Sequence, residues 1–233
     1  MVSSLQMAKS AYFGPELFQF LSDLKNHNDR DWFLANKARY EQHARDPFLR
    51  LIADLRPGFE KINPRIVVDP NPTRGSMMRI YRDIRFSADK TPYKTNLAAH
   101  FKHARAKADA IPGYYIHLEP GECMVGAGIW RPEPRAAQKI RNAIVAAPKR
   151  WQQVTAGKKF GTACMIGESL KRPPAGIDPK HPLIEDLKRK DFAVSVSLDD
   201  RDVCDPALLK LLLFSFQAMA PFVQFLSEAV GLK

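Results

Sequence analysis

Cysteine is scarce in this 233-residue sequence and never occurs in a close pair. The three cysteines, Cys123, Cys164 and Cys204, lie about forty residues apart, without the CxxC spacing of metal or redox motifs. An odd number of cysteines at wide spacing also argues against a disulfide framework. We therefore expect reduced thiols and a cytoplasmic location.

Long hydrophobic runs are absent as well. The stretch Met1 to Tyr12 lacks the apolar core of a secretory signal. The longest apolar cluster, Leu208 to Phe216, is interrupted by Lys210 and Ser215. It falls short of the ~18 apolar residues that span a bilayer. The pattern predicts a buried helix there and no membrane segment.

The sequence also lacks the short motifs that mark common active sites. No G-x-S-x-G nucleophile motif occurs, and the stretch Gly126 to Gly128 lacks the third glycine of a dinucleotide fingerprint. His100 and His103, followed by His117 and Cys123, superficially resemble a zinc set. On a strand, however, residues three apart point to opposite faces. We predict no metal and no cofactor.

Size and composition fit one globular domain. Hydrophobic residues make up 45% of the chain and charged residues 26%, which is ordinary for a folded domain and unlike a disordered chain. No long polar linker divides the sequence. We predict an N-terminal tail over residues 1–11 and a single α+β domain over residues 12–233.

Hydrophobic periodicity predicts helices at both ends of the chain. Leu17, Phe20, Leu21 and Leu24 follow the i, i+3, i+4, i+7 spacing of an amphipathic helix. Three helices are predicted near the N-terminus: they begin at Gly14-Pro15, at the capping Asp29 and at Asp46-Pro47, and the third ends at Pro57-Gly58. Two more cover Pro134 to Ala147, before Pro148, and Pro206 to Ala218. Pro221 either kinks the last helix or starts a final one to Val230.

Alternating apolar and polar residues predict a sheet between these helices. The clearest signal is a hairpin, in which Tyr114 to Leu118 and Cys123 to Trp130 flank the turn sequence Glu119 to Glu122. Met77 to Phe86 fits a helical face or one face of a strand equally well. Further strand candidates are Ile66 to Val68, Leu97 to Phe101 and Phe192 to Leu198. The predicted fold class is α+β, a mainly antiparallel sheet with N-terminal helices and a C-terminal helical segment.

Positive charge is concentrated in one part of the chain. The formal net charge is +11. Between Arg74 and Lys107 nine Lys or Arg stand against two Asp, a local net charge of +7, so the rest of the chain carries only +4. A concentrated excess of cations indicates attraction to an anionic partner more specifically than a diffuse one does.

The densest part of this region runs from Arg79 to Lys94. Five cations fall within its sixteen residues: Arg79, Arg82, Arg85, Lys90 and Lys94. Arginine offers a planar fork for phosphate or carboxylate, and lysine adds a point charge. Tyr93 could donate its hydroxyl or stack on a base. The functional interpretation is a preformed anion site made of these six residues.

A structural interpretation of the same stretch carries equal weight. The arginines could hold loops in place by pairing with carboxylates such as Glu119, Glu122 or Glu133. We expect Asp83 to orient Arg82 or Arg79, as a supporting residue and part of a buried pair. Neighbouring guanidinium groups should depress the pKa of Asp83, which makes it a poor base near neutral pH.

The stretch also resembles a known family. The pattern R-x-x-R-D-x-R-F-x-x-x-K-x-P-Y-K resembles the hallmark of domain of unknown function 2461, and this chain matches it without departure from Arg79 to Lys94. Trp32-Phe33 and Gly126 to Gly128 are similar to that family too. The resemblance implies coverage of residues 12–230 and relatives of similar length, mostly bacterial. It implies no activity, substrate or cofactor.

Four hypotheses follow from these residues. The leading one is a protein that binds an anionic, phosphate-bearing small molecule. The alternatives are an enzyme acting on a phosphorylated or carboxylated substrate, a purely structural arginine network, and a nucleic-acid-binding module. The last would stack bases on aromatic residues near the cations: Phe86, Tyr93, Phe101, Tyr114 and Tyr115.

Overall fold

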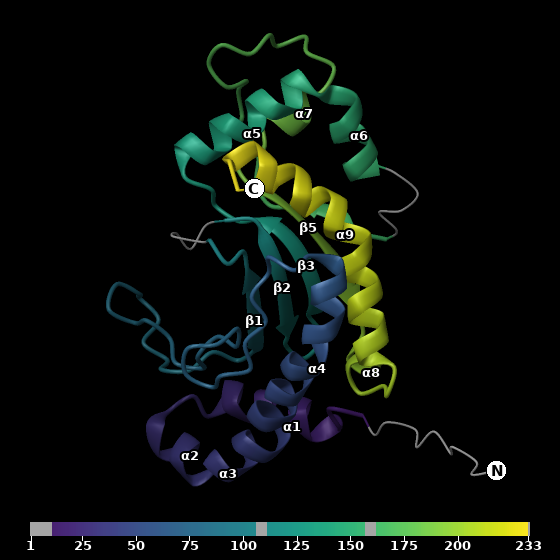
Figure 1. Cartoon of the computed structure of the whole chain (residues 1–233). Helices are drawn as coiled ribbons and strands as arrows, with labels where there is room; N and C mark the ends of the chain where they lie inside the picture. Colours follow the sequence, from purple (N-terminus) through teal and green to yellow (C-terminus); the bar gives the residue numbers. More distant parts are fainter. Residues whose placement is uncertain (1–10, 106–110, 157–161, 233) are drawn as a thin grey trace, which may run out of the picture.

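The centre of the molecule is an antiparallel sheet of five strands in the order β1-β2-β3-β5-β4. The structure is a computed structural model that describes residues 11–105, 111–156 and 162–232 (Figure 1). The predicted tail over residues 1–11 therefore lies almost entirely outside the described residues. The strands are β1 (Leu97–Lys102), β2 (Gly113–Leu118), β3 (Cys123–Ile129), β4 (Cys164–Ile166) and β5 (Phe192–Leu198).

The sheet has one apolar face and one polar face. On β2, Tyr114, Ile116 and Leu118 are buried, whereas Tyr115 and His117 alternate with them and point to the other side. Pairing with β1 sets Ala98 opposite His117 and His100 opposite Tyr115. The hairpin predicted around Glu119 is confirmed, since the Glu122 amide donates to the Glu119 carbonyl at 2.9 Å.

Helices cover the apolar face and both ends of the sheet. α9 crosses in front of the strands, α4 rises beside it, α1 to α3 form the base and α5 to α7 the top (Figure 1). Their bounds are α1 (Pro15–Asn26), α2 (Arg30–Ala35), α3 (Lys37–Tyr40), the π-helical turn η1 (Glu41–Arg45), α4 (Asp46–Ile62), α5 (Pro134–Ala146), α6 (Pro148–Ala156), α7 (Ile184–Leu187), α8 (Asp200–Val203) and α9 (Leu208–Val230). The α+β class and the helices at both ends are confirmed.

The end predicted for α4 is wrong. The helix continues through Pro57 to Ile62, because its next apolar residue, Phe59, is buried against Phe101, Tyr114 and Phe216 with ring centroids 5.1 Å away from each. Burial of an aromatic ring outweighs the loss of one helical hydrogen bond at proline.

The same helix begins at Asp46-Pro47 as predicted, but the capping role expected for Asp46 is wrong. Asp46 does not cap a new helix, since η1 joins α3 to α4 and the residue before Asp46 has helical dihedral angles. Asp46 instead pairs with Arg45 at 2.8 Å. By contrast, Asp29 caps α2 as predicted and accepts a bond from the Trp32 amide at 2.9 Å.

Two other prolines were predicted to end or interrupt helices. α5 ends before Pro148 as predicted, and Pro148 begins α6. Pro221 lies inside α9, so of its two predicted roles the start of a separate final helix is wrong. With 23 residues, α9 meets the length and apolar composition of a bilayer-spanning helix, which the sequence analysis did not anticipate. Ten of its side chains are buried, and it packs on β3, α4, α5 and α6. This is the packing of a core helix, which passes the same test.

The segment from residue 64 to 96 forms neither a helix nor a regular strand. The strand predicted over Ile66 to Val68 is reduced to a single bridge from Ile66 to His103, and Met77 to Phe86 contains only bridges at Met77 and Tyr81. This segment folds as irregular loops along the outer edge of β1 (Figure 1). Its Met78 amide donates to the Ala98 carbonyl at 2.8 Å, which anchors the loops to the sheet.

Candidate functional site

Short backbone contacts hold the stretch Arg79 to Lys94 as an irregular hairpin. The Lys94 amide donates to the Ile80 carbonyl at 2.7 Å, and the Arg82 amide donates to Pro92 at 2.9 Å. The side-chain amide of Asn28 then binds both backbone groups of Tyr93, each at 3.0 Å. Asn28 therefore connects the hairpin to the N-terminal helices.

Tyr93 lies in the hydrophobic core. Its ring stacks on Phe33 with centroids 4.2 Å apart and an angle of 19° between the planes, and only 4% of the residue is exposed. Pro92 and the two Asn28 contacts fix this position. The side chain consequently packs between the hairpin and the helices and lines neither of the cavities described below.

The charge pairs of the hairpin differ from those expected. Asp83 does not pair with Arg82 or Arg79; it forms a two-bond pair with Arg85, at 2.7 Å to Nη2 and 2.9 Å to Nε. Arg82 pairs with Asp89 and Thr91. The buried Arg82–Asp83 pair was thus wrong, because the loop turns the two adjacent side chains toward different partners.

The pKa values of both acids move as expected for carboxylates beside guanidinium groups. Hydrogen bonds from Arg85 lower the pKa of Asp83 to about 2, and those from Arg82 and Thr91 lower that of Asp89 to about 2. Both carboxylates stay ionised near neutral pH, so neither suits a general base. Glu119 contacts Thr95 and His117, not an arginine of the motif.

The two lysines of the hairpin make the same kind of contact in different surroundings. Lys90 donates to the Ile84 carbonyl at 3.0 Å and is exposed. Lys94 donates to the Arg79 carbonyl at 2.8 Å and is half-buried. Burial, and to a lesser extent the Arg79 charge, lowers the pKa of Lys94. No carboxylate of the described residues forms an ion pair with it.

A cavity of about 510 Å³ lies between the hairpin and the edge of β1. We call it the basic chamber, because four cationic side chains and one carboxylate line it. Within residues 11–105, 111–156 and 162–232, the guanidinium groups of Arg74 and Arg79 have no hydrogen-bond or ion-pair partner. The charged residues and the histidine of this lining are Arg74, Arg79, Asp83, Lys94, His100 and Lys102.

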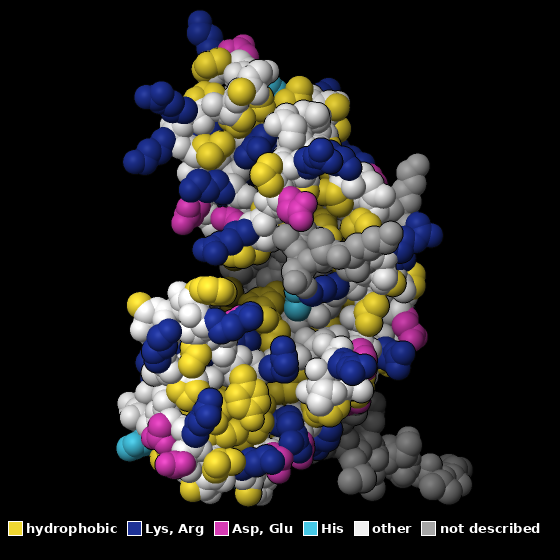
Figure 2. Space-filling model, turned by 90° about the vertical axis from the view of Figure 1, so that its left-hand side faces the viewer, with side chains coloured by type: hydrophobic (Ala, Val, Ile, Leu, Met, Phe, Trp, Pro, Cys, Tyr) yellow, Lys and Arg dark blue, Asp and Glu magenta, His cyan; other side chains and the backbone are white. Residues whose placement is uncertain are grey.

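A second cavity of about 370 Å³ adjoins the first and reaches the polar face of β2. We call it the histidine chamber, and the two chambers together the groove. They share Met78, Asp83 and Lys94 in their linings. The histidine chamber adds Arg82, Asn96, Ala98, Tyr115 and His117. Figure 2 views this side of the molecule and shows a hollow at mid-height with Lys and Arg side chains above and below it.

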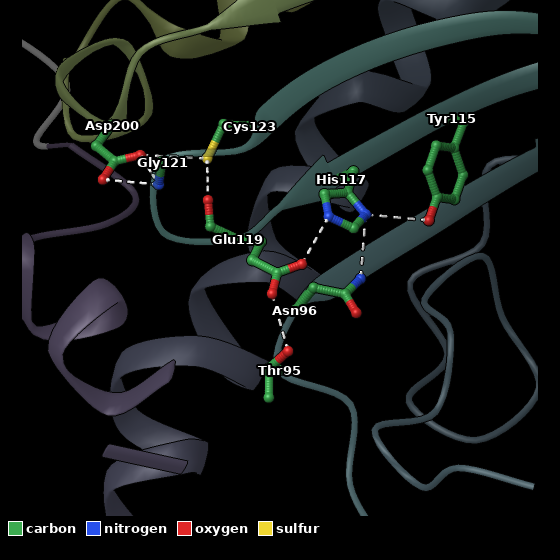
Figure 3. A network of polar contacts seen from close by, with 8 residues as sticks. All are labelled: Thr95, Asn96, Tyr115, His117, Glu119, Gly121, Cys123 and Asp200. Carbon is green, nitrogen blue, oxygen red and sulfur yellow. Dashed lines mark hydrogen bonds and ion pairs between the residues drawn. The ribbon is translucent and has the colours of Figure 1, made fainter. Parts of the chain in front are cut away.

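A chain of polar contacts orients His117 on the wall of the histidine chamber (Figure 3). Nδ1 faces the Asn96 amide nitrogen at 3.2 Å and the Tyr115 hydroxyl at 3.4 Å, while Nε2 lies 3.2 Å from Glu119 Oε2. Two donors at Nδ1 make it the acceptor, so Nε2 carries the proton and donates to Glu119. Thr95 completes the chain by donating to Oε1 of Glu119 at 2.9 Å.

Tyr115 and Cys123, at the two ends of this region, have raised pKa values. Burial and then the Glu119 charge raise the pKa of Tyr115, so its hydroxyl keeps its proton and can donate it. Burial raises the pKa of Cys123 to about 12. The thiol donates to the Glu119 carbonyl at 3.2 Å (Figure 3) and is too weakly acidic to serve as a nucleophile at neutral pH.

The histidines do not form a metal centre with other ligands in the described part of the chain, where no group of three His, Cys, Asp or Glu side chains comes together. His100 faces the Tyr115 ring edge-on at 6.4 Å, on the polar face of the sheet. His103 is buried. The zinc set suggested by sequence spacing is thus dispersed: His100 lies on β1, His103 directly after it, His117 on β2 and Cys123 on β3.

Comparison with protein families gives one match. The family model described as Conserved hypothetical protein (DUF2461) matches residues 16–225. The chain belongs to this family. The resemblance expected from the Arg79 to Lys94 pattern is confirmed over most of the predicted range of residues 12–230. Neither the curated proteins nor the solved structures compared with it contain a match.

In this DUF2461 chain the structure brings together only part of the predicted site. Arg79, Arg82 and Lys94 line the groove, together with the supporting Asp83. Arg85 and Lys90 are not among its lining residues, and Tyr93 is in the core.

The opposite wall of the groove contributes Asn96, Tyr115 and His117, which were not predicted as parts of the anion site. Tyr115 was a candidate for base stacking and His117 for a zinc set. Tyr115, His117 and Glu119 occupy alternate positions along β2 and its turn, and Asn96 directly precedes β1. The alternation of these three polar side chains along a predicted strand was the signal that they share one face of the sheet. Their proximity to Lys94 depends on how the loops fold over β1.

Proposed function

We propose that the groove binds a small anionic ligand bearing a phosphate or carboxylate group, with Lys94 at its centre. The observation that carries this proposal is the position of the Lys94 ammonium. It is half-buried, lines both chambers and has a backbone carbonyl as its hydrogen-bond acceptor. A cation withdrawn from water without a carboxylate partner is destabilised, and a bound anion would relieve this.

The surrounding charges favour the same ligand class. Arg74 and Arg79 line the basic chamber, and neither guanidinium is neutralised by a described side chain. Two arginine forks and a lysine are suited to a phosphate group, which accepts several hydrogen bonds. The chamber volumes of about 510 and 370 Å³ match the size of small-molecule sites.

The competing interpretations account for other residues of the motif. The structural interpretation fits Arg82 and Arg85, whose guanidinium groups pair with Asp89 and Asp83, but it leaves Arg79 and Lys94 unexplained. A nucleic-acid module would need outward-facing cations beside stacking aromatics. Among its aromatic candidates, Tyr93, Phe101 and Tyr114 are buried and Tyr115 is half-buried, which leaves Phe86 exposed.

We also propose a cytoplasmic location, as the sequence suggested. All three cysteines are unpaired thiols. Such thiols suit a reducing compartment.

Thermal denaturation with inorganic phosphate, pyrophosphate and a nucleoside triphosphate tests the proposed site. A ligand of this class at a hundred times its Kd should stabilise the protein by about 2.7 kcal/mol, or about 5–10 °C for a domain of this size. The variant Lys94→Met keeps the side-chain stem and removes the charge. We expect its affinity, measured by calorimetry, to fall at least about tenfold.

Lys90→Met is the matched control, because Lys90 makes the same carbonyl contact outside the groove. It should retain the affinity of the unmodified protein. The proposal is wrong if no anion of the panel raises the melting temperature, or if the two lysine variants lose affinity equally.

A further inference from the structure

We infer that the ligand is a phosphorylated aldehyde or ketone and that Lys94 Nζ forms an imine with its carbonyl carbon. This inference rests on the proposed function and names both its substrate class and its chemistry. It joins three features of the described residues: the position of Lys94 where the chambers meet, the unpaired arginines on one side and the oriented hydroxyl and imidazole on the other.

The position of Lys94 meets the geometric demands on an imine-forming lysine. Such a lysine must reach the ligand and must be able to lose its proton. Lys94 lines both chambers, and its hydrogen bond goes to the neutral carbonyl of Arg79 at 2.8 Å. Since no carboxylate of the described residues pairs with it, no ion pair opposes deprotonation.

Burial and a neighbouring cation also favour the neutral amine. They lower the pKa of Lys94, burial more than the Arg79 charge. Desolvation and nearby positive charge are the two general means of activating a lysine as a nucleophile. Lys90, which is exposed, lacks both the burial and a place in the groove.

The two chambers divide the ligand between them. Arg74 and Arg79 in the basic chamber suit the phosphate group. The ligand's carbonyl would then lie beside Lys94 and face the histidine chamber, where Tyr115 and His117 form the wall. A small molecule with a phosphate at one end and a carbonyl at the other therefore fits the groove, which has arginines in one chamber and proton-carrying side chains in the other.

The Tyr115–His117 pair supplies the proton transfers that imine formation requires. The Tyr115 hydroxyl faces Nδ1 of His117 at 3.4 Å, and Glu119 fixes the imidazole from the other side at 3.2 Å. A tyrosine whose pKa is raised by burial keeps a proton to donate. The imidazole can accept a proton at Nδ1 and return it.

The step balances without an oxidant or reductant. The lone pair of the neutral Lys94 amine forms a bond to the carbonyl carbon, and the π electrons of the C=O bond move to oxygen. Tyr115 protonates that oxygen. One nitrogen proton returns to the Tyr115 phenolate, and the Tyr115–His117 pair carries the other from nitrogen to the hydroxyl oxygen, so that the C–O bond breaks and water leaves. The products are the imine and one water molecule.

Pyridoxal 5′-phosphate is a suitable probe, because it carries both a phosphate and an aldehyde. The protein is incubated with the probe at a low molar ratio, reduced with borohydride and digested, and labelled peptides are identified by mass spectrometry. We expect labelling to concentrate on Lys94 and to be suppressed by excess inorganic phosphate. Pyridoxal, which lacks the phosphate, should label Lys94 at least about tenfold less.

Lysine variants separate this chemistry from surface labelling. Lys94→Met should lose the main labelled peptide, whereas Lys90→Met should keep it. The inference is overturned if label spreads over exposed lysines without preference for Lys94. It is also overturned if Lys94→Met keeps the same yield of imine.

A third variant tests the proton carriers. Tyr115→Phe removes the hydroxyl and retains the ring, and it should slow imine formation with the probe by about 10²-fold, a far larger factor than its change in the Kd for inorganic phosphate. An unchanged rate would overturn the role of Tyr115. If phosphate still stabilises the protein but no imine is trapped, the covalent step fails and the anion site stands. If phosphate does not stabilise the protein and no imine is trapped, both the anion site and the covalent step are wrong.

Discussion

At the scale of single residues, the groove depends on how one lysine is surrounded. Lys94 faces Arg79 and Arg74 in the basic chamber and Arg82, Asp83, Tyr115 and His117 in the histidine chamber. A neutral carbonyl accepts its hydrogen bond. The same residue type four positions earlier, Lys90, lies outside both chambers and is exposed.

The lowered pKa of Lys94 predicts a pH dependence of anion binding. The charged Lys94 ammonium attracts inorganic phosphate, so the affinity for phosphate should fall as pH rises through the pKa of Lys94, which lies below its ordinary value. The fall should occur at a lower pH than the titration of an ordinary lysine and be absent in Lys94→Met. Calorimetric titration with phosphate at a series of pH values measures it.

The same shift has the opposite sign for the stability of the ligand-free protein. Because the unfolded chain holds the Lys94 proton more tightly than the folded one, stability should rise with pH between the two pKa values. A pH dependence of phosphate affinity that is identical in Lys94→Met would contradict the assignment to this residue.

Asp83 and Tyr93 allow a second residue-scale test. Asp83→Ala removes a fully exposed carboxylate paired with exposed Arg85, and such surface pairs contribute little. We expect the melting temperature to change by less than about 2 °C. Tyr93→Ala removes a buried ring stacked on Phe33 and should lower stability by about 3–5 kcal/mol. Urea denaturation of both variants checks this, and a large loss for Asp83→Ala would restore the buried-pair interpretation.

At the scale of elements, the central strands β3 and β5 of the sheet approach each other closely. Gly126 and Gly128 lie on β3 opposite β5. A β-carbon at Gly128 would lie 2.2 Å from the Phe192 carbonyl oxygen, and this residue has φ of 122°. The close strand packing expected for these glycines is confirmed at Gly128.

Gly128 and Gly121 form a matched pair for testing this packing. Both have positive φ, but nothing lies within 4 Å of a β-carbon at Gly121. Gly121→Ala should cost about 1–2 kcal/mol from backbone strain alone. Gly128→Ala adds a clash with the backbone of β5 and should cost at least about 3 kcal/mol. Equal losses in chemical denaturation would show that β3 and β5 can separate to admit a methyl group.

At the scale of the whole molecule, the charge is not spread evenly. The region from Arg74 to Lys107 carries a net +7 of the total +11, and its loops before β1 lie along the outer edge of that strand (Figure 1). Helices cover the apolar face, whereas the other face carries Tyr115 and His117 toward the loops. The irregular loops therefore form the second wall of the groove in place of a helix.

The sequence alone determined the elements whose signals are local. Alternation along Tyr114 to Leu118 and Phe192 to Leu198, the cap at Asp29 and the hairpin turn depend on neighbouring residues, and the structure has them where they were predicted. The pattern from Arg79 to Lys94 likewise identified the family. Local dihedral preferences and hydrophobic periodicity suffice for such features.

Only the tertiary structure decided which cations of the Arg79 to Lys94 stretch converge. Adjacent residues in a loop without regular structure have no fixed face, so the sequence could not show that Asp83 turns to Arg85 or that Tyr93 enters the core. It also could not place Lys94 and His117 in the lining of one cavity, because that cavity forms only when the loops fold over β1. Packing between distant segments made these choices, as it did when buried Phe59 carried α4 past Pro57.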